Sequence, residues 1–183
     1  MQNSLSRVWF LNQGCKQVPL EHSRGIVRWG HPDGCFLNAQ GQKVAHSYSP
    51  THQLGSATYT HGVKYPVERQ TGSKACHILM ALAFEGPRPV FTDRNGKSYV
   101  GICHHLIPDK LDYRPANLLC WLTREQHAEA DRRQRALRQL LPDMHALPYD
   151  EHRRLQDPRS MSREQFEIIL QSLKDYYGTE KHL

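Results

Sequence analysis

The chain has 183 residues and a formal charge of +6, with 38% hydrophobic residues, which suits one globular core with room for an appendage. The basic balance indicates a polyanionic partner such as nucleic acid, with an ordinary basic protein as the alternative. Five cysteines without a CxxC pair argue against a secreted disulfide framework and favour the reducing cytoplasm. No apolar run approaches the roughly 18 residues of a membrane span, so we expect neither a leader segment nor a membrane partner.

Residues 1–73 are predicted to form a β-rich N-terminal region. Short runs rich in β-branched and aromatic residues alternate here with turn-forming segments such as GHPDG and SPTHQLGS. The runs with strand character are RVWFL, GIVRW, GCFLN, QKVAHSY and VKYPVER. No repeat period is present, which argues against a solenoid.

Residues 74–141 are predicted to form a compact core that starts with a short buried helix. The apolar run of residues 74–84 consists of good helix formers and is closed by Gly86 and Pro87. A lone histidine on an apolar helix is more often a buried core residue than a ligand. We therefore leave His77 out of the candidate site.

A hairpin and a second helix complete this core. The segment VFTDRNGKSYVGICHH predicts two strands around an Asn95–Gly96 turn, the second running into a histidine pair. A polar loop with two prolines leads to the short strand LLCWL. Thr123 and Gln126 form a capping box, which predicts a helix start, and Pro142 is expected to stop this arginine-rich helix.

Residues 142–183 are predicted to form a helical C-terminal tail. Ser162 and Gln165 make a second capping box, and an apolar stripe follows it at helical spacing. The residues of the stripe are Phe166, Ile169, Leu170, Leu173 and Tyr177. We expect the stripe to pack on the rest of the chain or on a partner, and a homodimer through it remains an alternative.

Four polar residues of the hairpin and the following helix suit the hydrolysis of a phosphodiester. His104 and His105 end a strand and point to opposite sides of it, so a helix across the hairpin would bring His104 and His127 around one divalent ion. Such an ion keeps open positions for phosphate oxygens. A histidine suits the role of general base near neutral pH, and the amide of Asn117 suits a role in fixing the orientation of that base.

The stretch of roughly residues 75–135 resembles the HNH, or ββα-metal, endonuclease family, most closely its phage homing-endonuclease branch. HILMALAFEGP, the strand ending in HH, the Asn-Leu strand and the helix with a histidine in its first turns carry the resemblance. It implies that His105 is the general base, His104 and His127 are metal ligands, and Asn117 orients the base. Asp112 stands where the family usually has an asparagine.

The predicted fold is α+β: a ββα-metal hairpin–helix core, a β-rich N-terminal region and a helical tail. The predicted function is metal-dependent cleavage or nicking of DNA with one divalent ion, Mg²⁺ first and Mn²⁺, Ni²⁺ or Zn²⁺ as alternatives. Arg124 and Arg132 are the predicted phosphate contacts, although a merely solvated helix face is the competing interpretation.

Three other interpretations stay open. The first is a non-catalytic nucleic-acid-binding or regulatory protein that retains the HNH fold. The second is a structural zinc site made by Cys103, Cys120 and His127, since Zn²⁺ favours sulfur and nitrogen ligands. In the third, the histidines are only polar loop residues.

Overall fold

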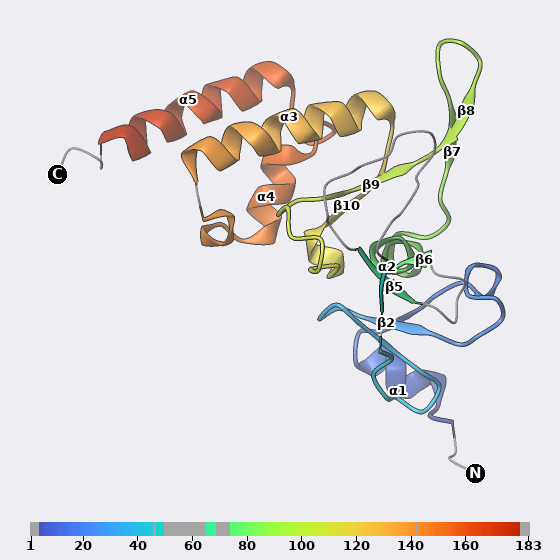
Figure 1. Cartoon of the computed structure of the whole chain (residues 1–183). Helices are drawn as coiled ribbons and strands as arrows, with labels where there is room; N and C mark the ends of the chain where they lie inside the picture. The colour runs from blue at the N-terminus through green and yellow to red at the C-terminus, as the bar shows by residue number, and fades with distance from the viewer. Residues whose placement is uncertain (1–3, 46, 50–64, 69–73, 142, 180–183) are drawn as a thin grey trace. The chain divides into compact units, whose positions relative to one another are not determined.

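The computed structural model describes residues 4–45, 47–49, 65–68, 74–141 and 143–179 (Figure 1). The protein has a mixed α+β fold with small antiparallel sheets and helices, which agrees with the predicted class. It divides into two compact units, Met1–Arg88 with Asp109–Leu118 and Pro89–Pro108 with Leu119–Leu183. The segment boundaries expected after residues 73 and 141 stay predictions.

The first helix, α1 (Arg7–Asn12), occupies the run RVWFL, so the prediction of a strand there is wrong. Ser6 caps this helix, because its hydroxyl oxygen accepts a hydrogen bond from the backbone N–H of Trp9 at 3.3 Å. Phe10 is buried and stacks on Trp29, with ring centroids 4.5 Å apart. The local cap and this aromatic contact outweigh the strand preference of Val, Trp and Phe.

Two small antiparallel sheets follow in the first unit. One consists of β1 (Lys16–Gln17), β2 (Trp29–His31) and β3 (Cys35–Leu37), so the run GCFLN contributes a strand as predicted. The run GIVRW does not form the predicted strand, because only its last residue, Trp29, belongs to β2. A single turn of 3-10 helix, η1 (Leu20–His22), joins β1 to β2. The other sheet contains β4 (Ser47–Ser49), β5 (Tyr65–Glu68) and β6 (Lys74–Ala75). Most of the predicted turn SPTHQLGS lies outside the described residues.

Helix α2 (Cys76–Glu85) confirms the predicted buried helix, and Gly86 ends it with a positive φ of 81°. Leu79 and Met80 of this helix are fully buried, whereas His77 is half-buried. Strand β2 approaches the helix closely at Gly30, where an added Cβ would lie 2.8 Å from the sulfur of Met80. A short 3-10 helix, η2 (Pro115–Asn117), also packs against α2.

The second unit begins with a hairpin of β7 (Val90–Thr92) and β8 (Ser98–Val100). Asp93 closes its turn, because one carboxylate oxygen accepts the backbone N–H groups of Asn95 and Lys97, each at 2.9 Å. Gly96 has a φ of 75°, which a glycine adopts without strain. The predicted Asn–Gly turn is confirmed.

Strands β9 (Ile102–His105) and β10 (Leu118–Leu122) form a two-stranded sheet, and helix α3 (Arg124–Leu140) follows it (Figure 1). The capping box is confirmed: the Thr123 hydroxyl accepts from the Gln126 N–H at 3.2 Å, and the Thr123 N–H donates to the Gln126 side chain at 2.9 Å. Apolar residues from the sheet and the helix form a buried cluster, namely Leu106, Leu119, Leu122 and Ala130. Pro142, expected to stop α3, lies outside the described residues.

The β7–β8 hairpin is attached to the first turn of α3. The guanidinium of Arg124 lies 3.0 Å from a carboxylate oxygen of Asp93 and 4.4 Å from the centroid of the Tyr99 ring. The backbone N–H of Arg124 also donates to the Tyr99 hydroxyl at 3.4 Å. One of the N–H groups that a helix start leaves without an intrahelical partner thus finds an acceptor on the hairpin.

Helices α4 (Tyr149–Gln156) and α5 (Arg163–Thr179), preceded by η3 (Met144–Ala146), pack against α3 as a helical tail. Ser162 and Gln165 make the second predicted capping box, with bonds of 2.8 and 3.2 Å. Phe166 and Leu170 of the predicted stripe are buried in a cluster of this unit, which also contains Ile107, Leu137, Met144 and Leu155. The stripe therefore packs on its own chain, and a homodimer stays a prediction.

Candidate metal site

His104 is the buried side chain at the centre of the candidate site. It belongs to β9, where consecutive side chains point to opposite faces of the strand. Its imidazole is 4% exposed and contacts residues of α3. Cys103, the preceding residue, instead contacts Cys120 of β10, with 3.5 Å between the two sulfur atoms.

Helix α3 brings two further ligating groups to His104. His127 and Asp131 are four residues apart, so they lie on one face of the helix in successive turns. Nδ1 of His104 lies 3.1 Å from one carboxylate oxygen of Asp131, and Nδ1 of His127 lies 3.5 Å from the other. The ligating atoms of the three residues all lie within 4.8 Å of one another. This spacing suits coordination of one cation by two imidazoles and a carboxylate.

The charges at this cluster suit metal binding near neutral pH. Burial lowers the pKa of His127, and the nearby His104 lowers it further against the opposing effect of Asp131. A hydrogen bond with His104 holds the pKa of Asp131 below its usual value. A neutral imidazole and an ionised carboxylate are the forms that bind a cation.

Gln134 holds His104 from the side opposite Asp131. Its side-chain nitrogen lies 3.3 Å from Nε2 of His104 and donates to the backbone oxygens of His105 and Leu106, the latter at 2.9 Å. These bonds tie the end of β9 to α3 and keep Nδ1 of His104 directed at Asp131.

The sequence alone did not identify Asp131 and Gln134 as members of the site. In the sequence, Asp131 is one carboxylate among the arginines of the helix. Its place four residues after His127 was the available signal, because that spacing aligns side chains on a helix. For Gln134 the sequence offers no comparable signal, since its role depends on where the end of β9 crosses α3.

His105 and Asn117 belong to different compact units. His105 is half-buried and follows His104 on β9, so its side chain leaves the strand on the other face. Asn117 is fully buried, and its amide nitrogen donates to the backbone oxygen of Asp112 at 2.9 Å, which closes the loop before β10. Their assignment as general base and orienting residue stays a prediction.

The two arginines predicted to bind phosphate are engaged within the fold. Arg124 pairs with Asp93 of the β7–β8 hairpin. Arg132 pairs with Glu129 at 2.8 Å and with Glu167 at 2.7 Å. Phosphate binding by either arginine stays a prediction, and it would have to compete with these ion pairs.

The structure gives no support to the zinc alternative in the described part of the chain. Cys103 and Cys120 contact each other, but His127 is grouped with His104 and Asp131. That group of three contains no cysteine. The alternation of side chains along β9 explains the separation, because the Cys103 and His104 side chains leave the strand on opposite faces.

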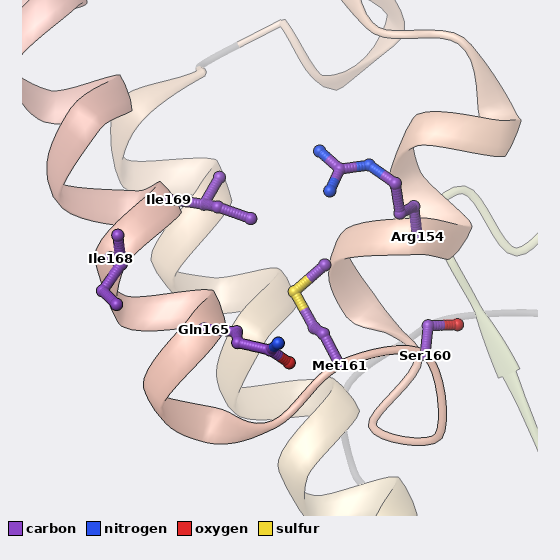
Figure 2. A pocket seen from close by; sticks show the side chains of 6 residues that line it. All are labelled: Arg154, Ser160, Met161, Gln165, Ile168 and Ile169. Atoms are coloured by element: carbon purple, nitrogen blue, oxygen red, sulfur yellow. The ribbon is translucent and has the colours of Figure 1, made fainter.

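An open hollow of about 410 Å³ lies between α4 and α5 (Figure 2). Its walls are formed by Arg154, Ser160, Met161, Gln165, Ile168 and Ile169. None of these residues belongs to the His104–His127–Asp131 cluster. The ligating residues, and not this hollow, therefore define the candidate site.

Comparisons with known proteins do not assign a function to this chain, so the function has to be inferred from the residues of the site. No protein-family model matches the chain, and neither curated proteins nor solved structures match it. Within the described residues, no helix is both long and apolar enough to cross a membrane.

Proposed function

We propose that this chain is a metal-dependent endonuclease that hydrolyses DNA phosphodiester bonds on a ββα-metal core of the HNH kind. The observation that supports this most is the cluster of His104, His127 and Asp131. The two histidines were the expected metal ligands, and they lie against one shared carboxylate although they come from a strand and a helix.

The donor set fits a divalent cation, with two imidazole nitrogens and one carboxylate oxygen. His104 is buried, whereas the side chains of His127 and Asp131 are 30% and 40% exposed, so one side of the cluster faces solvent. A bound cation would supply Lewis-acid stabilisation of the charge on the scissile phosphate and on the leaving 3′-oxygen. The two imidazoles suit Ni²⁺ and Zn²⁺, whereas the carboxylate suits Mn²⁺ and the expected Mg²⁺.

The residues around the cluster carry the rest of the proposed reaction. His105 takes a proton from the attacking water, since a histidine titrates near the working pH. Asn117, whose amide nitrogen donates to the backbone oxygen of Asp112, is the residue proposed to orient the base. Gln134 holds the His104 ring through its second nitrogen.

Plasmid nicking by the purified full chain tests the proposal. The protein is first freed of metal with a chelator, and Mg²⁺, Mn²⁺, Ni²⁺ or Zn²⁺ is then added separately. We expect nicking with at least one ion, and a loss of roughly 10²- to 10⁴-fold in His105→Ala. His145→Ala, at an exposed histidine of η3, is the matched control and should nick at the rate of the unaltered chain.

Two outcomes would overturn parts of the proposal. Nicking by His105→Ala at the unaltered rate would remove the general-base assignment. DNA binding without nicking under any of the four ions would favour the non-catalytic nucleic-acid-binding protein. Thermal unfolding of each variant shows whether a loss of activity reflects a loss of fold.

A further inference from the structure

Most arginines of the helical part of the second unit pair with carboxylates. Arg132, Arg133 and Arg163 share Glu129, at 2.8, 2.9 and 3.0 Å respectively. Arg124, Arg154 and Arg159 pair with Asp93, Glu151 and Asp157. An outside anion would have to compete with these carboxylates for the arginines.

Arg135 and Arg138 of α3 differ from this group. Both are exposed, and in the described part of the chain no carboxylate lies within the 4.0 Å of an ion pair from either. In an α-helix, residues three, four, seven or eleven positions apart share a face. Arg135 and Arg138 therefore lie on the face of α3 that carries His127 and Asp131.

Arg135 is close enough to the metal cluster for its charge to act on Asp131. Its charge is one of those that lower the pKa of Asp131, after the larger effects of His104 and His127. A divalent ion in the cluster would carry more positive charge than Asp131 carries negative charge. The metal site, Arg135 and Arg138 would then form one positively charged strip along α3.

We propose that Arg135 and Arg138 bind the phosphates of a DNA strand on one side of the metal cluster. This assignment rests on the proposed nuclease function, and it replaces Arg124 and Arg132 as the favoured phosphate contacts. The residues recognise the sugar–phosphate backbone and not the bases, so they position the strand without selecting its sequence.

The spacing along α3 suits such a strand. With a rise of about 1.5 Å per residue, Arg135 lies about 6 Å and Arg138 about 10 Å from Asp131 along the helix axis. One DNA strand advances about 3.4 Å along the duplex axis per nucleotide. Over these distances a strand that passes the metal cluster presents two or three further phosphates to the arginines.

The test is the salt dependence of DNA binding by the double variant Arg135→Gln/Arg138→Gln. A short fluorescent duplex is titrated with the full chain in chelator, so that no cleavage occurs, at several salt concentrations. We expect about 10-fold weaker binding near physiological salt, and a slope of log K against log salt that falls by about 2. The control Arg154→Gln/Lys174→Gln removes the same charge from α4 and α5 and should change the affinity less than about 2-fold.

The possible results separate this inference from the nuclease proposal. If the Arg135/Arg138 variant keeps the unaltered slope while the protein nicks plasmid, the inference is wrong and the nuclease stands. If the slope falls but no ion supports nicking, the phosphate contacts stand and the nuclease is wrong. A chain that does not bind DNA overturns the inference as well. An equal loss in the control variant would show non-specific attraction and overturn it too.

Discussion

Helix α3 carries charged residues on two faces that differ in how these charges are used. On one face, Glu129 is surrounded by the guanidinium groups of Arg132, Arg133 and Arg163. On the other, His127 and Asp131 approach the buried His104, while Arg135 and Arg138 stay exposed. We call these the paired face and the ligating face.

The comparison shows that arginine content alone does not locate a binding surface. The paired face holds the helices together: the buried Arg133 donates to the backbone oxygens of Leu155, Asp157 and Met161, which connects α3 to α4 and to the segment before α5. The ligating face collects the groups that can bind a cation. Substitutions on the first face should therefore cost stability, and those on the second should cost binding.

The largest effect is expected at Arg133 on the paired face. Arg133→Met fills a similar volume but leaves three buried backbone oxygens without their donor, and we expect a loss of about 4 kcal/mol in the free energy of unfolding. Urea denaturation measures it. Arg154→Met is the control, because its ion pair with Glu151 is exposed to water and should contribute less than about 1 kcal/mol. Equal losses in both variants would contradict the comparison.

Asp131 on the ligating face should show the opposite behaviour. Asp131→Asn keeps the shape but removes the anionic ligand, and we expect Mn²⁺ binding to weaken about 100-fold, or about 2.7 kcal/mol, by calorimetry. The metal-free stability should change by less than about 1 kcal/mol. Asp150→Asn, at an exposed residue of α4, should bind Mn²⁺ as the unaltered chain does. Unchanged binding by Asp131→Asn would show that His104 and His127 hold the ion without the carboxylate.

A smaller effect is expected from the titration of Glu129. Hydrogen bonds from Arg132 and then from Arg133 hold the pKa of Glu129 at about 2, below its ordinary value of 4.5. The stabilisation is therefore complete above about pH 4.5 and is lost as the pH falls toward 2. Because water screens the outer arginines, we expect Glu129→Gln to cost about 2 kcal/mol at pH 7.

Urea denaturation at pH 7 and pH 3 measures this dependence. The difference between Glu129→Gln and the unaltered chain should shrink at pH 3. Glu164→Gln, at an exposed residue of α5, should show no such change. A difference that is the same at both pH values would show that the charge of Glu129 does not stabilise the paired face.

Local signals made several elements predictable. The boxes at Thr123–Gln126 and Ser162–Gln165 and the turn at Asn95–Gly96 depend only on neighbouring residues, and all three are present. Helix α1 was not predicted, because its residues favour strands and the deciding contact joins Phe10 to Trp29, far along the chain. Local preference predicts an element well when no distant contact opposes it.

The candidate site was predictable to the extent that it follows from the order of elements. A strand ending in His104 and a helix carrying His127 sufficed to expect that the two would meet, and their rings lie 5.4 Å apart. The role of Gln134 could not be predicted from the sequence, because only the crossing of β9 and α3 places its amide beside His104 and two backbone oxygens. Tertiary geometry of this kind leaves no pattern in the sequence.

The attachment of the β7–β8 hairpin to α3 has a consequence for local opening of the molecule. A two-stranded hairpin is marginally stable by itself in water, so the contacts of Arg124 with Asp93 and Tyr99 add to the few interactions that keep this one closed. Its backbone amides should therefore exchange with solvent hydrogen faster than those of α3, in a single opening event. Substitution of Arg124 would speed this exchange in the hairpin while the amides in the middle of α3 stay protected.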